Sequence, residues 1–302
     1  MESPQESLGI DVGGSSVKLA LVRRGGSANA FETIWQAQSE TYNRPAVAQL
    51  AAAIRKAVDG RFPAGACCGI CVPGLRDAGS HVVKLSVNLP ALNGLNLDDL
   101  LRDALDQPPA RIDVLTDAVA NAYDIYAIHN LHGRLLSLAL GTGVGAAIID
   151  EGGIPLKVDG ESPGHIGQVD VSIAGDDCLG PDGGAGSLEG YIGTPALIKR
   201  HGPDMAATLQ KLGPDDSALK ALARAIRICH AIYCPQHVAL TGGLGNRMAH
   251  LLPIIRSLVE TNLTSIAKKN WTLLTGNDDF HAAKGAAKFA AGGPRMNADE
   301  RG

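Results

Sequence analysis

The sequence predicts an α/β protein built as two domains. Its 302 residues suffice for two packed cores, and 45% of them are hydrophobic, which is typical of a globular chain. Residues 8–22 and 135–150 each have the pattern strand, glycine turn, strand. Two copies of one motif, about half a chain apart, indicate an internal duplication with one glycine hairpin in each half. Helical patterns lie among the other predicted strands, so each half combines a sheet with helices.

The first hairpin, residues 8–22, carries a carboxylate, Asp11, just before its turn. Apolar residues alternate along both of its strands. The pair Gly13 and Gly14 is expected to supply the positive φ that a tight hairpin turn asks for. With Ser15 beside them, several backbone N–H groups remain uncovered, as in loops that hold phosphate. The glycines lead into a strand rather than a helix, and their spacing fits neither the dinucleotide-binding motif nor the P-loop.

The remainder of the first half is predicted in chain order. A third strand over residues 31–36 extends the hairpin to an antiparallel meander. A helix over residues 45–60 begins at a proline, ends at a glycine and has apolar residues at helical spacing. A buried strand follows over residues 66–72. Residues 75–97 are expected to be irregular, and a short amphipathic helix begins at Asp98.

The second half contains a long loop and a second pair of glycines. The expected elements are a strand over 111–115, a helix to about residue 130, the hairpin over 135–150, the loop over 152–190, helices within 194–234, a strand over 237–241, a helix over 246–261, a strand over 271–274 and a helix over about 281–291. So long a loop in a compact domain is more often functional than accidental. Gly242 and Gly243 precede a predicted helix, whose N-terminal N–H groups are available to a nucleotide.

Composition excludes several classes of protein. The net charge of −4 gives no electrostatic footprint for nucleic acid. No segment reaches the roughly 18 uninterrupted apolar residues of a membrane span, and the N-terminus has no export signal. We therefore expect a cytoplasmic protein that binds neither nucleic acid nor membrane.

The cysteines do not predict a disulfide framework or a metal site. Six are spread unevenly over a long chain. Cys68 and Cys71 form a C-x-x-C pair, but the second pair that a zinc site needs is missing. They lie in an apolar strand pattern, so small buried side chains are favoured over metal or redox chemistry.

Five segments together resemble one family. They are residues 9–15, residues 88–90, Asp117 after a short strand, residues 141–145 and the pair at 242–243. Their order resembles that of the ROK family of bacterial sugar kinases, within the hexokinase, Hsp70 and actin-like ATPase superfamily. The resemblance covers nearly the whole chain, from residue 8 to about 291.

The resemblance implies a fold, a domain division and an assembly. The fold is α/β, the two-domain actin-like ATPase (ribonuclease H-like) fold, in which each domain is a mixed sheet flanked by helices and the active site lies in the cleft between the domains. The expected small domain spans residues 1–112 together with the C-terminal helix at about 281–302. The expected large domain spans residues 113–280. From the resemblance to the family we also expect the protein to be a homodimer.

The resemblance also implies a carbohydrate kinase that transfers the terminal phosphate of ATP, with polyphosphate as the alternative donor, to a hydroxyl of a hexose or related sugar. Asp117 is the expected general base, and Asp11 the carboxylate near Mg²⁺, through water. The expected phosphate- and nucleotide-binding residues are Asp11, Gly13, Gly14, Ser15, Thr142, Gly143, Gly242 and Gly243. The expected sugar-binding residues are Asn88, Thr116, His165, Gln168 and Glu189.

The sugar side departs from the family pattern. In the run Gly164-His165-Ile166-Gly167-Gln168, histidine replaces the family's glutamate and glutamine replaces its histidine. The family's cysteine cluster is reduced to Cys178, and because a lone thiol and a histidine cannot complete a tetrahedral site, we predict no structural zinc. Thr116 replaces an asparagine, and an aromatic residue after Pro90 is missing. The phosphate side is nearly intact, which favours a phosphoryl-transfer enzyme with an altered acceptor.

Simpler roles remain open for the same residues. Asp117 precedes a helix and without the resemblance would be assigned as an N-cap. Asp11 could be a strand-end hydrogen-bonding residue, Glu189 a solvated loop carboxylate and His165 an ordinary loop histidine. Lys18 is expected to be solvated or in an ion pair. The altered sugar signature also leaves open a non-catalytic sensor of sugar or nucleotide.

Overall fold

The computed structural model describes residues 6–26, 30–77, 79–86, 89–157, 164–181, 183–265, 267 and 270–292. The chain forms two compact units. Unit 1 comprises residues 1–131, 157–161 and 280–302, and unit 2 comprises residues 132–156 and 162–279. Each unit is a β-sheet flanked by helices, which confirms the predicted α/β class. No described helix has both the length and the apolar composition to cross a membrane.

Unit 1 is built on a five-stranded mixed sheet in the order β3-β2-β1-β4-β7. The predicted hairpin and third strand form the antiparallel meander, and β4 and β7 continue the sheet in parallel with β1. The strands are β1 (Glu6–Val12), β2 (Val17–Arg24), β3 (Phe31–Gln38), β4 (Cys67–Cys71) and β7 (Ile112–Leu115).

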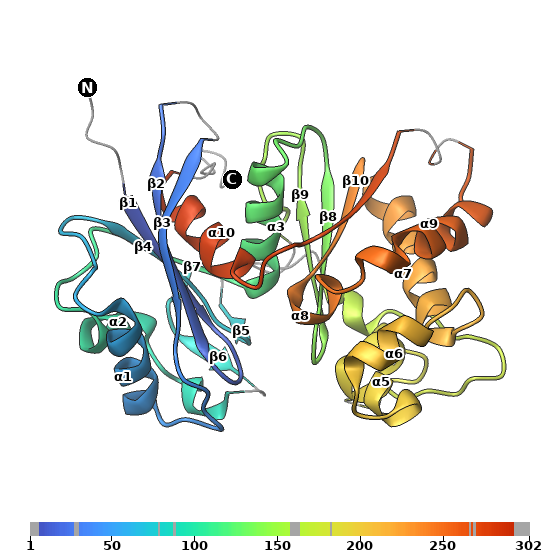
Figure 1. The fold of residues 1–302 in the computed structure, drawn as a ribbon, viewed down its shortest axis with the longest axis horizontal. Coiled ribbons are helices and arrows are strands. Elements are labelled where there is room, and N and C mark those ends of the chain that lie inside the picture. The colour runs from blue at the N-terminus through green and yellow to red at the C-terminus, as the bar shows by residue number, and fades with distance from the viewer. Residues whose placement is uncertain are drawn as a thin grey trace. The chain divides into compact units, whose positions relative to one another are not determined.

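Helices cover the two faces of this sheet. They are α1 (Val47–Val58), α2 (Leu97–Ala104), α3 (Asp117–Ile128) and α10 (His281–Ala290). Leu8 and Ile10 of β1 share a buried core with α1 and α2. Because alternate residues of a strand point to opposite faces, Gly9 and Asp11 lie on the other side. There α10 returns to the strands of unit 1 and packs against β1, β4 and α3, as Figure 1 shows.

Three glycines allow α10 to lie directly on the sheet and on α3. Gly9 and Gly69 are partners in the β1–β4 register. A Cβ atom on either would collide with the backbone of α10, at Ala283 and Ala286 respectively. Gly285 of α10 makes the equivalent close approach to α3. Residues 113–131, which the sequence analysis assigned to the large domain, belong to unit 1 in this division, and α3 there packs on α10.

Residues 75–97, expected to be irregular, contain short elements. β5 (Leu75–Arg76) and β6 (Val83–Leu85) form a two-stranded antiparallel sheet, followed by the 3₁₀ turn η1 (Pro90–Leu92). The strands are too short to show an alternating pattern, so periodicity could not reveal them. Asn88 lies outside the described residues.

Unit 2 repeats the design of unit 1. Its four-stranded sheet has the order β11-β10-β8-β9, with β8 (Leu135–Leu140), β9 (Val144–Ile149), β10 (His237–Thr241) and β11 (Thr272–Thr275). The glycine hairpin β8–β9 is antiparallel, and β10 and β11 are added in parallel beside β8. The hairpin β1–β2 stands in the same relation to β4 and β7. This correspondence agrees with the predicted duplication.

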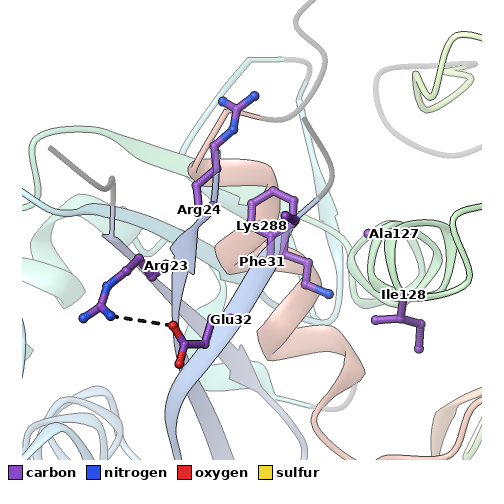
Figure 2. Close-up of a pocket in the computed structure, with 9 residues that line it drawn as sticks. Arg23, Arg24, Phe31, Glu32, Ala127, Ile128 and Lys288 are labelled. Atoms are coloured by element: carbon purple, nitrogen blue, oxygen red, sulfur yellow. Dashed lines mark ion pairs between the residues drawn. The ribbon is translucent and has the colours of Figure 1, made fainter. Parts of the chain in front are cut away.

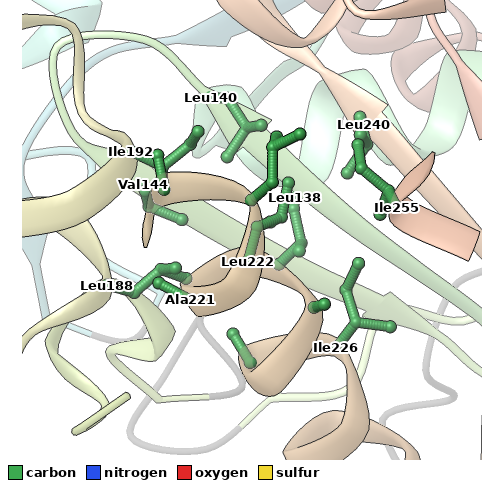
Figure 3. Close-up of a cluster of buried hydrophobic side chains, with 14 of the residues drawn as sticks. Leu138, Leu140, Val144, Leu188, Ile192, Ala221, Leu222, Ile226, Leu240 and Ile255 are labelled. Carbon is green, nitrogen blue, oxygen red and sulfur yellow. The ribbon is translucent and has the colours of Figure 1, made fainter. Parts of the chain in front are cut away.

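The core of unit 2 joins its sheet to the longest helix. Leu138 of β8 and Leu240 of β10 belong to one buried cluster with Leu222 and Ile226 of α7 (Ser217–Tyr233) and Ile255 of α9 (Leu252–Thr261), as Figure 3 shows. The other helices and turns are η2 (Ile166–Gln168), α4 (Leu188–Ile192), α5 (Thr194–His201), α6 (Met205–Lys211), α8 (Gly242–Gly245) and η3 (Ala249–Leu251).

The predicted helix over residues 246–261 is wrong in its first part. The glycines themselves form the short α8, η3 follows, and α9 begins only at Leu252. Pro253 lies in the first turn of α9, where proline favours helix initiation. Asn246 is instead held by its side-chain amide, which donates to the carbonyl of Asp278 at 2.9 Å.

Candidate functional site

The first glycine turn lies between β1 and β2 and is open on its outer side. The N–H of Gly13 donates to the carbonyl of Ser16 at 3.0 Å and closes the turn. Gly14 and Ser15 are exposed, and a Cβ atom on Gly14 would meet nothing within 4 Å. Neither Gly13 nor Gly14 has a positive φ, so the conformational reason given for them from the sequence is wrong. The open outer side leaves room for a ligand against the backbone.

Residues after β3 hold this turn, and no sequence pattern pointed to them. Tyr42 donates its backbone N–H to the carbonyl of Ser15 at 2.8 Å and its hydroxyl to the carbonyl of Gly13 at 2.6 Å. Gln38 donates to the hydroxyl of Ser16 at 3.0 Å. The carbonyls of Gly13, Ser15 and Ser16 therefore have partners within unit 1.

Asp11 lies near the end of β1 and Asp117 just after β7, and β4 lies between these two strands in the sheet. In the sheet register Asp11 pairs with Cys71, and Cys71 pairs with Leu115. Asp117 comes just after Leu115, at the start of α3. Because β1, β4 and β7 are parallel, their carboxyl ends lie on one edge of the sheet, where ligands of open α/β sheets typically bind.

The pKa values of both carboxylates are raised. Burial is the main cause that raises the pKa of Asp11 to about 6, and the charge of Asp117 raises it further, while Lys18 and a hydrogen bond from the thiol of Cys71 lower it. The side chain of Asp117 reaches solvent, but the protein atoms packed around it raise the pKa of its carboxyl. Carboxylates whose pKa is raised in this way are found at functional sites.

Thr116, rather than Asp117, caps α3. Its hydroxyl accepts a hydrogen bond from the N–H of Val119 at 3.2 Å, which is the usual N-cap contact. Asp117 is the first residue of the helix, and one of its oxygens accepts from the N–H of Ala118 at 2.8 Å. The alternative of Asp117 as the N-cap is therefore wrong.

Cys68 and Cys71 are free, buried thiols of β4. Burial raises the pKa of both, so they stay protonated at neutral pH. The sulfur of Cys71 lies 3.5 Å from a carboxylate oxygen of Asp11. This agrees with the interpretation of the pair as small buried side chains.

The second glycine turn joins β8 and β9 and contains Thr142, which is exposed. The N–H of Gly141 donates to the carbonyl of Gly143 at 3.0 Å. Glu189 of α4 lies against this turn: one of its carboxylate oxygens accepts from the N–H of Val144 at 2.7 Å. A Cβ atom on Gly143 would be 2.7 Å from the same oxygen, so the contact needs glycine there.

Glu189 also contacts the altered loop. Its other oxygen accepts from the amide of Gln168 at 2.9 Å, and Gly167 packs against the carboxylate so closely that a Cβ atom would be 2.6 Å from it. The structure thus brings together two sequence-predicted residues, Gln168 and Glu189. His165 is exposed, and its ring has no hydrogen-bond partner in the described part of the chain.

Gly242 and Gly243 lie where β10 enters α8. Gly242 has φ of 76°, and a Cβ atom on it would be 2.6 Å from the carbonyl of Leu140, so glycine is required there. Gly243 is exposed and has open space beside it. Across the described residues, no three His, Cys, Asp or Glu side chains are grouped so as to hold a metal ion.

With both glycine turns and the paired carboxylates in place, comparison with known sequences decides the family. A sequence model described as the ROK family matches residues 7–292. The chain belongs to the ROK family. A comparison with curated protein sequences gave no significant match.

Solved structures of other proteins share the fold. A ROK family glucokinase from Streptomyces griseus, in complex with glucose and AMPPNP, is 20% identical, has a TM-score of 0.70 and covers 94% of this chain and 99% of its own. A polyphosphate/ATP-glucomannokinase from Arthrobacter is 19% identical, with a TM-score of 0.62 and 95% and 98% coverage. A ROK family transcriptional regulator, described as a homologue of the Escherichia coli MLC protein, is 17% identical, with a TM-score of 0.74 and 95% and 78% coverage.

A cavity of about 490 Å³ in unit 1 is separate from the residues assigned above to the ROK site. It is lined by Arg23, Arg24, Gly25, Ala30, Phe31, Glu32, Ala127, Ile128 and Lys288. Figure 2 shows its three cationic side chains directed to different sides rather than toward one point. Arg23 lies beside Glu32, and Lys288 contacts Asp124. The arrangement does not form a convergent anion site.

Proposed function

We propose that this ROK protein is a carbohydrate kinase that transfers the terminal phosphate of ATP to a hydroxyl of a hexose or a related sugar. The observation that carries the proposal is the pair Asp11 and Asp117 at one edge of the unit 1 sheet, beside the open glycine turn. Phosphoryl transfer needs a positioned base and stabilisation of phosphate charge. Asp117 would supply the base, and the N–H groups of the turn, with a cation held by Asp11, would stabilise the phosphate.

Asp117 would act as the general base. The pKa of its carboxyl is raised above that of an ordinary aspartate and so lies nearer to pH 7. A base with a higher pKa is better able to take a proton from a hydroxyl. The exposed backbone at Gly14 and Ser15 would hold phosphate oxygens, as uncovered N–H groups do in anion-binding loops. Thr142 and Gly143 in unit 2, with Gly242 and Gly243, are the further candidates for phosphate and nucleotide contacts.

A magnesium ion fits the donor set of unit 1. Mg²⁺ is usually bound by one or two carboxylates plus substrate phosphates. The pKa of Asp11 is raised by burial and by the charge of Asp117, and a bound cation would offset both effects. The ion would neutralise phosphate charge. The chain offers only Cys178 and His165 near the position of the family's metal loop, so the absence of structural zinc remains our prediction.

The acceptor is proposed to be a sugar because Glu189 and Gln168 are held together beside the exposed His165. Neutral histidine and glutamine groups can both donate to and accept from hydroxyls. Thr116 uses its hydroxyl as a helix cap, so any sugar contact would add to that bond. Asn88 lies outside the described residues. A homodimer also remains a prediction.

The test is an ADP-release assay with ATP and Mg²⁺ over hexoses, amino sugars and N-acetylated sugars, repeated with polyphosphate and detection of the sugar phosphate. A sugar-dependent rate is expected, and Asp117→Asn should lower it by about 10²-fold or more, within the range of general base catalysis. Asp99→Asn, an exposed residue of α2, is the matched control and should leave the rate unchanged. No sugar-dependent rate, or an unchanged rate in Asp117→Asn, would refute the proposal.

The second candidate is a non-catalytic sensor of sugar or nucleotide. The replaced residues His165 and Gln168 favour it, because they alter the loop that the family uses for its sugar. The likeness to a transcriptional regulator shows that the fold also occurs in a protein described as a regulator. Calorimetry that finds sugar or nucleotide binding, with no turnover for any sugar in the panel, would favour this candidate over the kinase.

A further inference from the structure

Tyr42 contacts the first glycine turn through both its main chain and its side chain. Its N–H donates to the carbonyl of Ser15, and its hydroxyl donates to the carbonyl of Gly13 at 2.6 Å. Tyr42 lies in the segment between β3 and α1, so it is far from the turn in sequence. One residue thereby fixes the orientation of two peptide groups of the turn.

The orientation of these peptide groups decides what the turn presents to a ligand. In a trans peptide the carbonyl and the following N–H point in opposite directions. Because the carbonyl of Gly13 points at Tyr42, the N–H of Gly14 points away from it. The N–H of Gly14 has no acceptor within the described part of the chain, and the residue is exposed. The peptide between Gly13 and Gly14 therefore presents a donor rather than an acceptor at the open side of the turn.

Glycine makes this orientation easy to lose. Gly13 and Gly14 have no Cβ atom, so the peptide between them has access to a wide range of φ and ψ. If this peptide turned over, the carbonyl of Gly13 would replace the N–H of Gly14 at the open side. A carbonyl oxygen facing a phosphate is repulsive, whereas an N–H group binds it.

We propose that Tyr42 is a positioning residue, which keeps the peptide between Gly13 and Gly14 turned with its N–H toward a bound phosphate. The role in catalysis rests on the proposed kinase function, but the orientation itself belongs to the ligand-free chain. Burial, and the charge of Asp11, raise the pKa of the Tyr42 hydroxyl. The hydroxyl therefore remains a hydrogen-bond donor at neutral pH.

The variant Tyr42→Phe removes the hydroxyl and keeps the ring. Calorimetry should show that it binds AMPPNP with Mg²⁺ about 3- to 10-fold more weakly than the wild type, the effect of one hydrogen bond. Adenosine, which carries no phosphate, should bind both proteins equally. Tyr233→Phe, in α7 of unit 2, is the matched control and should bind both ligands as the wild type does. In the kinase assay, Tyr42→Phe should raise the KM for ATP and leave the KM for sugar unchanged.

A readout in the ligand-free protein separates this proposal from the proposed function. Hydrogen exchange of peptides that cover residues 12–17 should be faster in Tyr42→Phe than in the wild type, with no change in unit 2. If the wild type binds no phosphate-bearing ligand, the kinase proposal fails, and exchange alone decides whether Tyr42 holds the turn. Unchanged exchange at the turn, or equal losses for AMPPNP and adenosine, would overturn the positioning role.

Discussion

Asp124 of α3 and Lys288 of α10 form a buried ion pair, with the ammonium nitrogen of Lys288 2.5 Å from a carboxylate oxygen of Asp124. The other carboxylate oxygen lies 2.5 Å from the ring of His281, and all three side chains are at most 6% exposed. The contact joins two helices that are far apart in sequence. It fixes the last helix to unit 1, where Asp117 begins α3.

Removal of Asp124 should therefore destabilise unit 1. Asp124→Asn leaves the ammonium group of Lys288 buried without a counter-charge, and breaking a buried pair in this way costs about 3 to 5 kcal/mol. Urea unfolding would measure the loss. Asp99→Asn, which breaks the exposed pair with Arg102, should change stability by less than about 1 kcal/mol. Equal effects of the two variants would contradict the structural role of the pair.

The glycines beneath α10 should be equally intolerant of change. A methyl group added at Gly9 or Gly69 collides with helix backbone, which cannot move aside as a side chain would. Gly9→Ala is expected to cost about 3 kcal/mol or more, at the upper end for an overpacked site. Gly213→Ala is the control, because a Cβ atom there meets nothing within 4 Å and the residue does not need a positive φ. Thermal unfolding of both variants would show the difference.

The sequence predicted the hairpins and most helices because their signals are local. Alternating apolar residues beside glycines identify β1–β2 and β8–β9, and Pro45 and Gly60 bracket α1. The contacts that organise the fold are not local. Nothing in the pattern around Gly9 and Gly69 indicates that a helix from the other end of the chain rests on them.

The candidate site was predictable where a motif marks it and not where tertiary contacts create it. Asp11 and Asp117 were identified through the family resemblance, and the structure adds their shared sheet edge. Tyr42 belongs to no motif, so only its hydrogen bonds reveal it. The glycines of the first turn were expected to adopt a positive φ; the structure shows instead that they leave space.

The raised pKa of Asp11 predicts a pH-dependent stability. A carboxyl whose pKa is raised by folding stabilises the folded state below its unfolded pKa of 3.8, and that stability is lost as the pH rises through about 6. Asp11→Asn mimics the protonated form at every pH. It should therefore exceed the wild type in stability by about 2 to 3 kcal/mol at pH 8, and the difference should shrink toward zero near pH 4.

Urea unfolding of both proteins from pH 4 to pH 8 would measure this difference, with Asp99→Asn as the exposed control. A variant less stable than the wild type at pH 8 would show that the Asp11 carboxylate is stabilised by its surroundings rather than strained. A stability gain combined with loss of the proposed activity would mark Asp11 as a residue kept for function at a cost in stability.

The double contact of Glu189 gives a test that separates positioning from sugar binding. Its carboxylate accepts from the N–H of Val144 in the second turn and from the amide of Gln168 in the altered loop. Glu189→Ala removes both acceptors. A hydrogen bond to a charged group contributes about 1.5 to 3 kcal/mol, so hydrogen exchange at residues 141–144 should be about tenfold faster or more.

Glu189→Gln retains an oxygen for Val144, and the amide of Gln168 can turn to accept from the new NH₂ group. Protection should therefore survive in Glu189→Gln. If sugar-dependent turnover also survives, Glu189 acts by holding the two loops together; if protection survives and turnover is lost, its charge contacts the sugar.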